Sequence, residues 1–252
     1  MVHQVAAAGF SDAVDYEAAR PSYPREAVQW LVDRMRPGAD RLVCDLAAGT
    51  GKLTRLLVGA GIRVVAVEPV AGMREAFRGV LPAVPIVAGT AESMPFADAA
   101  LPAVAVAQAF HWFDPAGAAA ELARVVPRGG VVTLCWNARD RSLEWVDAVW
   151  TIIDRVEQRA PWRDLENWRE RARSIPGFDR FDEAEFHHEH TLTPDAVVRR
   201  VASVSHVAVL PRPERDAVLD EVRTILRSHP STRDRDAVQI PYRVDCVAFR
   251  RT

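Results

Sequence analysis

The chain has 252 residues, of which 49% are hydrophobic and 26% are charged, as in an ordinary globular protein. Its 32 basic residues nearly balance 34 acidic ones, and the formal net charge is −2. This balance argues against a nucleic-acid binder that relies on charge, because such proteins carry a clear basic excess. The length suits one elaborated domain or two small ones.

Cysteine usage and hydropathy narrow the class of protein further. The three cysteines, Cys44, Cys135 and Cys246, lie far apart in apolar runs, which predicts buried thiols and neither a disulfide framework nor a zinc site. The N-terminal residues lack the pattern of a signal peptide, and no apolar run is long enough for a transmembrane helix. We therefore expect a cytoplasmic protein without a membrane partner.

The first half of the chain alternates helical periodicity with short apolar runs. We expect helices at 25–35, 53–59, 70–80 and 115–126, and strands at 41–46, 62–67, 84–87, 103–108 and 130–136. Asp114 is placed to cap the last of these helices, with Pro115 in its first position. Continuously apolar strands between helices predict a parallel sheet covered on both faces, which right-handed crossovers wind into a doubly wound α/β fold.

The second half has a different pattern. Helical segments are expected at 143–173, 194–209 and 213–228, and strands at 183–193 and 238–250. Pro241 inside the last strand predicts an edge position or a bend at that point. The two late strands would complete a seven-stranded, mostly parallel sheet within a single domain that spans 1–252.

A glycine-bearing turn follows the first predicted strand, with the sequence DLAAGTG at 45–51. Open α/β sheets bind ligands at the carboxyl ends of their strands, beside the point where the strand order reverses. Gly49 and Gly51 allow the backbone to approach a ligand closely, and the helix that follows has free N-terminal amides. The second strand ends in Glu68, where a carboxylate can accept hydrogen bonds from ribose hydroxyls.

Three interpretations of this turn compete. A phosphate-binding P-loop is ruled out, because Leu53 follows Gly51-Lys52 where Ser or Thr is required. A dinucleotide fingerprint lacks its third glycine, whose place is taken by Thr54, so a nicotinamide cofactor is poorly supported. The third interpretation is S-adenosyl-L-methionine.

A family resemblance over residues 12–137 favours this third interpretation. The matching segments, in order, are 15–24 (DYEAARPSYP), 43–54 (VCDLAAGTGKLT), 65–69 (VAVEP), 89–96 (GTAESMPF), 108–113 (QAFHWF) and 124–130 (RVVPRGG). Together they resemble the motifs of class I S-adenosylmethionine-dependent methyltransferases of the small-molecule branch, the type-11 group that includes trans-aconitate methyltransferase-like proteins. The one departure is Ala47, where the family usually has glycine.

The resemblance implies a Rossmann-like fold and a set of residues around the cofactor. The expected cofactor residues are Tyr16, Arg20, Asp45, Ala47, Gly49, Thr50, Gly51, Glu68, Pro69, Met73, Thr90, Ala91, Glu92, Gln108, Ala109 and Phe110. Among them, Glu68 would hold the ribose diol, and Asp45 would lie near the methionine ammonium or the loop amides. Structural roles stay open beside these: a turn-stabilising acid for Asp45 and a core side chain for Met73.

The sequence motifs identify the residues of the substrate pocket less specifically than those around the cofactor. Methyl transfer is an in-line displacement that depends on proximity, and only some nucleophiles require a base. The residues expected to line the substrate pocket are Tyr23, His111, Trp112, Trp136 and Asn137. His111 is the candidate catalytic base, because histidine titrates near neutral pH. Its alternative role is to pack against the cofactor or to cap a turn.

The segment His187-His188-Glu189-His190 raises the hypothesis of a metal site. On a strand, His188 and His190 share one face while His187 and Glu189 share the other, so at most two ligands lie together. Zinc sites usually have three or four protein ligands, so a polar edge strand is the preferred interpretation and no metal is expected.

These observations predict methyl transfer from S-adenosylmethionine to a small molecule, with an oxygen, nitrogen or carbon acceptor left open. Residues 1–30 would form an N-terminal lid and 31–137 the cofactor-binding core, while helical insertions at 138–182 and 194–229 would cap the substrate. The alternative is a protein that binds the cofactor without transferring its methyl group, for which Ala47 and the lack of a firm base leave room. A hydride-transferring enzyme is a third hypothesis.

Overall fold

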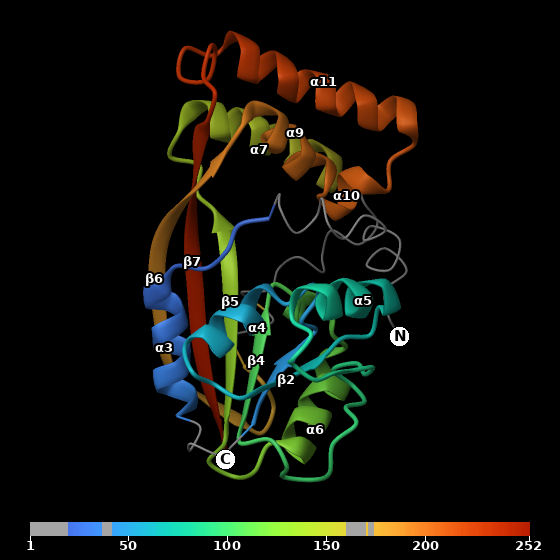
Figure 1. The fold of residues 1–252 in the computed structure, drawn as a ribbon, viewed down its shortest axis with the longest axis vertical. Coiled ribbons are helices and arrows are strands. Elements are labelled where there is room, and N and C mark those ends of the chain that lie inside the picture. Colours follow the sequence, from blue (N-terminus) through green and yellow to red (C-terminus); the bar gives the residue numbers. More distant parts are fainter. Residues whose placement is uncertain (1–19, 37–41, 160–169, 171–173) are drawn as a thin grey trace.

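The computed structural model describes residues 20–36, 42–159, 170 and 174–252, which build one seven-stranded sheet (Figure 1). The strands are β1 (Val43–Leu46), β2 (Val64–Val67), β3 (Ile86–Val87), β4 (Ala103–Ala107), β5 (Val131–Arg139), β6 (Phe178–Leu192) and β7 (Val238–Arg251). Their order is β3-β2-β1-β4-β5-β7-β6. The pairs among β1 to β5 are parallel, and β7 runs antiparallel between β5 and β6. The predicted doubly wound, mostly parallel sheet is confirmed.

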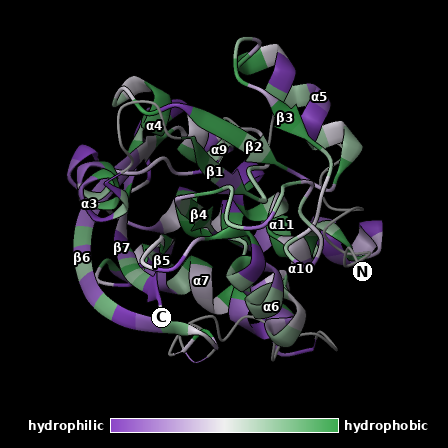
Figure 2. Ribbon diagram, turned by 90° about the horizontal axis from the view of Figure 1, so that it is seen from below, coloured by the Kyte–Doolittle hydropathy of each residue, from purple (hydrophilic) through white to green (hydrophobic). Residues whose placement is uncertain are grey.

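Helices cover both faces of this sheet. They are α3 (Arg25–Met35), α4 (Lys52–Gly59), α5 (Ala71–Val80), the short 3-10 helix η1 (Phe110–Trp112), α6 (Pro115–Val125), α7 (Glu144–Glu157), α9 (Pro194–Ala202), α10 (Ser205–Ala208) and α11 (Arg212–Ser228). Cys44 and Leu46 of β1 belong to the core beneath α6, whereas Val43 belongs to the core beneath α3 and α4. This alternation follows from the two-residue period of a strand, and Figure 2 shows apolar residues along β2 and β4 between the helices.

A second apolar core lies where the long strands extend beyond the short ones. Helices α7, α9, α10 and α11 pack together on the ends of β6 and β7, above the rest of the sheet in Figure 1. Trp145 and Trp150 of α7 are buried in this cluster.

Helix and strand boundaries differ from the sequence-based prediction in the second half. The strand expected from residue 183 begins at Phe178, because its pairing with β7 continues as far as Arg251. The helix expected at 194–209 is divided into α9 and α10, and Ser203 at the division donates its side-chain hydrogen bond to the Arg200 carbonyl at 2.8 Å. The predicted cap of α6 is confirmed, since the Asp114 carboxylate accepts from the Gly117 amide at 2.7 Å.

Pro241 does not mark an edge strand, because β7 lies between β5 and β6. The last pair of β7 with β5 is Tyr242 with Arg139, so at Pro241 the strand has a neighbour only on the β6 side. This is the local equivalent of an edge, where proline is tolerated. The edge strand itself is β6, on which His188 and His190 are half-buried while its other face is exposed.

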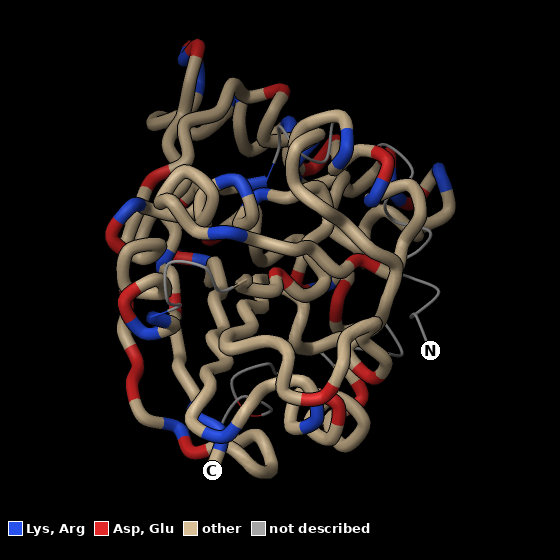
Figure 3. Tube along the Cα trace, turned by 60° about the horizontal axis from the view of Figure 1, so that its bottom comes forward, with Lys and Arg blue, Asp and Glu red and all other residues tan. Residues whose placement is uncertain are grey.

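The cysteines, the charged residues and the hydropathy of the helices agree with the composition of the chain. All three cysteines are buried thiols, and Cys135 and Cys246 face each other across β5 and β7 with their Sγ atoms 3.6 Å apart. Acidic and basic residues are interspersed along the described chain, as Figure 3 shows. Among the described residues, no helix combines the length and apolar composition needed to cross a membrane.

The turn between β1 and α4 generates a test of stability. Gly51 has a φ of +91°, and a Cβ at this position would lie 2.8 Å from side-chain atoms of Phe77 and Leu81. Gly49 has a φ of +58°, but its Cβ would meet nothing within 4 Å. We expect Gly51→Ala to lower the free energy of unfolding by roughly 3 kcal/mol, and the matched Gly49→Ala by only about 1 kcal/mol. Urea denaturation measures both, and equal losses would contradict the packing argument.

Candidate functional site

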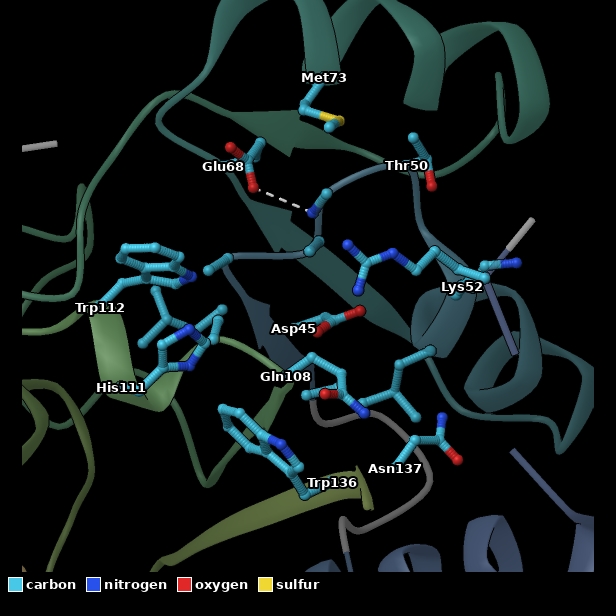
Figure 4. A pocket seen from close by; sticks show the side chains of 18 of the residues that line it. Asp45, Thr50, Lys52, Glu68, Met73, Gln108, His111, Trp112, Trp136 and Asn137 are labelled. Atoms are coloured by element: carbon cyan, nitrogen blue, oxygen red, sulfur yellow. Dashed lines mark hydrogen bonds between the residues drawn. The ribbon is translucent and has the colours of Figure 1, made fainter. Parts of the chain in front are cut away.

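A cavity of about 460 Å³ lies at the carboxyl ends of β1, β2 and β4, where the strand order reverses (Figure 4). The loops after these strands form one side of it, and residues of the N-terminal segment and of α9 and α10 form the other. Its volume falls in the range of small-molecule and cofactor sites, and its position is that of ligand sites in doubly wound sheets.

Most residues expected around the cofactor line this cavity. They are Arg20, Asp45, Ala47, Gly49, Thr50, Glu68, Pro69, Met73, Thr90, Ala91, Glu92, Gln108 and Ala109. The expected substrate residues line it as well: Tyr23, His111, Trp112, Trp136 and Asn137. Tyr16 lies outside the described residues.

Two of the expected cofactor residues have packing roles and are not among the residues that line the cavity. The missing side chain of Gly51 leaves space for Phe77 of α5 and for Leu81 directly after it, so this glycine serves the contact between the start of α4 and the end of α5. Phe110 is buried in the sheet core, with its ring centroid 5.7 Å from that of Phe113. Sequence motifs do not separate such neighbours, because adjacent residues of a turn point in different directions.

Glu68 at the end of β2 ties the second strand to the glycine turn. Its side chain is buried, and its two carboxylate oxygens accept hydrogen bonds from the amides of Gly49 and Val70, each at 2.9 Å (Figure 4 for the first). Burial raises the pKa of Glu68, while these amides and the nearby Arg74 oppose the rise. Two backbone amides therefore hold the carboxylate in place inside the cavity.

Asp45 at the end of β1 is the second buried carboxyl group of the cavity. Only 1% of the residue is exposed, and its Oδ2 accepts a hydrogen bond from the Thr54 hydroxyl at 2.5 Å. Burial raises the pKa of Asp45 to about 7, and the neighbouring Glu68 charge adds to the rise. A cation bound beside Asp45 would favour its ionised form, so this end of the cavity suits a positively charged ligand group.

At this edge of the sheet, two residues other than glycine have a left-handed backbone. Ala47, directly after β1, has a φ of 57°, and Gln108, directly after β4, has a φ of 58°. Such a conformation costs about 1–2 kcal/mol for a residue other than glycine and is concentrated at functional sites. The alanine at position 47 thus stands where the backbone itself favours glycine.

An aromatic group closes the cavity beside the end of β4. His111 in η1 is 7% exposed, and its ring centroid lies 4.5 Å from that of Trp112 and 4.9 Å from that of Trp136 on β5. The imidazole is thereby fixed between two indoles next to the ends of two neighbouring strands (Figure 4).

Side-chain hydrogen bonds attach the N-terminal segment to both halves of the molecule. Asn137 on β5 donates to the Ser22 carbonyl at 3.1 Å, and its Oδ1 lies 2.9 Å from His188 Nε2. Arg20 donates to the carbonyl of Ser203, beside α10, at 2.7 Å. Residues 20–23 therefore lie between the sheet and the upper helices, along the cavity.

Several residues that line the cavity were not predicted from the sequence. They are Lys52, Arg139, Arg200, Val204, Ser205 and Tyr242, among others. Lys52 follows the glycine turn directly, and its position at the start of α4 was a usable signal. The others come from β5, β7, α9 and α10, which carry no motif and reach the cavity only through the register of the sheet and the packing of the helices.

The fold and the site together define a class of protein. A doubly wound sheet with a single antiparallel strand beside β5, a glycine turn after β1 and an acid at the end of β2 are the features of Rossmann-like class I methyltransferases, whose donor is S-adenosylmethionine.

Comparison with known proteins agrees with this class. The family described as "Methyltransferase domain" matches residues 44–134. An uncharacterized methyltransferase of Mycobacterium tuberculosis is 41% identical over 239 residues, which cover 94% of this chain and 93% of the relative. A methyltransferase-like protein of Schizosaccharomyces pombe is 31% identical over 235 residues, which cover 92% of this chain and 91% of the relative. A solved structure described as a type II methyltransferase from Anaeromyxobacter dehalogenans has a TM-score of 0.72 and 26% sequence identity. The match covers 92% of this chain and 97% of that one. The chain belongs to this methyltransferase family.

The left-handed backbone at position 47 generates a prediction. Ala47→Gly is expected to raise the free energy of unfolding by about 0.5–1 kcal/mol, because glycine removes the steric strain. The matched change Ala48→Gly, one residue along the same turn, is expected to lower it by a similar amount through the entropy of the unfolded chain. Urea midpoints measure both changes, and a loss of stability in Ala47→Gly would contradict the strain argument.

The raised pKa of Asp45 generates a second prediction. Between pH 4 and pH 7 the native state keeps a proton that the unfolded chain has released, so the stability from this group is lost as the pH rises through 7. Asp45→Asn cannot ionise and still accepts from Thr54, so its stability relative to the natural protein is expected to increase by a few kcal/mol from pH 4 to pH 8. Urea unfolding at both pH values tests this, and a difference that stays constant with pH would refute it.

Proposed function

We propose that the cavity binds S-adenosylmethionine and that the protein transfers its methyl group to a small molecule held beneath the upper helices. The observation that carries this proposal is the pair of buried carboxyl groups, Asp45 and Glu68, on either side of the glycine turn. Buried carboxylates are unfavourable unless a partner or ligand compensates them, and the cofactor has a cationic ammonium group and two ribose hydroxyls.

The remaining lining residues fit the other parts of this cofactor. Each oxygen of Glu68 accepts one amide and keeps a further lone pair for a ribose hydroxyl. Met73 and Ala91 are buried apolar residues suited to the flat faces of adenine, with Glu92 nearby as a hydrogen-bond acceptor. Arg20 and Lys52 are cations suited to the methionine carboxylate.

The bound cofactor would supply an electrophilic methyl carbon, and the chain would supply alignment and exclusion of water. His111, Trp112 and Trp136 form a rigid wall beside the end of β4, where a nucleophile would be held. His111 would accept a proton from a hydroxyl or amine nucleophile, whereas a carboxylate nucleophile requires no base. Residues 20–23 would act as the lid, and Arg200, Val204 and Ser205 would belong to the cap.

One observation favours a second candidate function. Ala47 places a methyl group in a left-handed turn that lines the cavity, which would reduce the space for the methionine part of the cofactor. A protein of this kind could bind the cofactor without transferring the methyl group. Formation of S-adenosylhomocysteine with a panel of acids, phenols and amines separates the two functions, because a binding protein forms none.

Cofactor binding is tested by calorimetric titration with S-adenosylhomocysteine at pH 7.5. Replacement Glu68→Gln is expected to weaken binding by roughly 10- to 100-fold, because hydrogen bonds to a charged group are lost. The matched change Glu189→Gln, on the exposed face of β6, is expected to leave binding unchanged. Binding of NAD in place of S-adenosylhomocysteine by the natural protein would overturn the proposal.

A further inference from the structure

Tyr242 on β7 has a buried hydroxyl group that the cofactor proposal does not use. The residue lines the cavity, only 1% of it is exposed, and its hydroxyl has no hydrogen-bond partner within the described part of the chain. A buried hydroxyl without a partner is destabilising, so native proteins almost always provide one. A ligand in the cavity would satisfy it.

The position of the Tyr242 ring is fixed by its neighbours in the sheet. Tyr242 stands directly opposite Arg139 of β5 on one side and His188 of β6 on the other. Its ring stacks on the His188 imidazole, with centroids 5.6 Å apart and an interplanar angle of 24°. The hydroxyl is therefore held at a defined place, so the Tyr242 side chain loses little conformational entropy when a ligand binds to it.

Two guanidinium groups line the same end of the cavity. Arg139 donates to Asp154 at 2.8 Å and to Glu157 at 3.3 Å, and its Cζ lies 5.0 Å from the Trp150 ring centroid. Arg200 of α9 is 6% exposed, and its Cζ lies 5.5 Å from the same centroid. Contact with one buried indole thus restrains both arginines where β5 meets the upper helices.

The chemistry of these three groups limits what can bind them. A guanidinium group only donates hydrogen bonds, and a tyrosine hydroxyl donates readily. The complementary ligand group is an oxygen that accepts several hydrogen bonds, as in a carbonyl or a carboxylate. The other wall, formed by His111, Trp112 and Trp136, is aromatic and suits a flat apolar body.

We propose that Tyr242, together with Arg139 and Arg200, forms a subsite that holds a carbonyl or carboxylate oxygen of the methyl-accepting substrate. This proposal rests on the proposed function, because it assigns the substrate to the part of the cavity beyond the cofactor. Tyr242 acts as a specificity-determining residue and takes no part in the displacement. The substrate is then a small molecule with a flat apolar body and an oxygen acceptor group at one end.

The test uses the full chain saturated with S-adenosylhomocysteine and three probes of similar size. Benzoate carries a carboxylate, acetophenone a neutral carbonyl, and α-methylstyrene is the isostere of acetophenone without the oxygen. Calorimetric titration is expected to give at least about tenfold tighter binding for benzoate or acetophenone than for α-methylstyrene, as one or more hydrogen bonds predict. Preference for benzoate alone identifies a carboxylate, and equal preference identifies a carbonyl.

Two variants assign this preference to the subsite. Tyr242→Phe is expected to lose most of the preference, to bind S-adenosylhomocysteine within twofold of the natural protein, and to unfold at the same or a higher temperature. Thr133→Val is the matched control, because Thr133 also has a buried hydroxyl without a partner among the described residues but does not line the cavity. It is expected to keep the preference.

Each result decides between the two proposals. If S-adenosylhomocysteine does not bind, the proposed function fails before the subsite is tested. If it binds and the oxygenated probes bind no better than α-methylstyrene, or if Tyr242→Phe keeps their preference, the subsite is overturned. The first failure concerns the cofactor half of the cavity, and the second concerns only the substrate half.

Discussion

The shape of the cavity depends on one set of hydrogen bonds, which the amides of Gly49 and Val70 donate to the Glu68 carboxylate. The bond to Gly49 joins the end of β2 to the turn after β1, where Ala47 and Gly49 are both left-handed. On the β2 side, a backbone hydrogen bond from the Ala48 amide to the Val67 carbonyl, 3.1 Å long, supports this anchor against the strain in the turn. The position of α4, and with it the side of the cavity formed by the turn, follows from this turn.

The same constraint explains the electrostatics of the site. Glu68 on the turn lies near Asp45, and burial raises the pKa of both carboxyl groups. The charge of Glu68 adds to the rise in the pKa of Asp45. The fold tolerates this because backbone amides and the Thr54 hydroxyl stabilise the charges in part. A cationic ligand, as in the proposed function, would complete the compensation and would link the stability of the protein to what it binds.

The three strands β5, β7 and β6 connect this cavity to a second core. They are longer than β1 to β4, and their far ends carry α7, α9, α10 and α11. Because β7 runs antiparallel between β5 and β6, it brings Tyr242 opposite Arg139 at the level of the cavity. The parallel strands therefore carry the glycine turn and Glu68, and the antiparallel strand β7 brings Tyr242 to the side of the cavity below the upper helices.

Elements that depend on local patterns could be predicted from the amino-acid sequence. Apolar runs gave β1, β2 and β4 within two residues, Asp114-Pro115 marked the start of α6, and the turn at 45–51 with Glu68 located the cavity. Only the tertiary structure assigned Gly51 and Phe110 to packing, placed Pro241 in an interior strand, and brought Arg139, Arg200 and Tyr242 together. The physical reason is that turns and strands follow from neighbouring residues, whereas these contacts follow from strand register and helix packing across the whole chain.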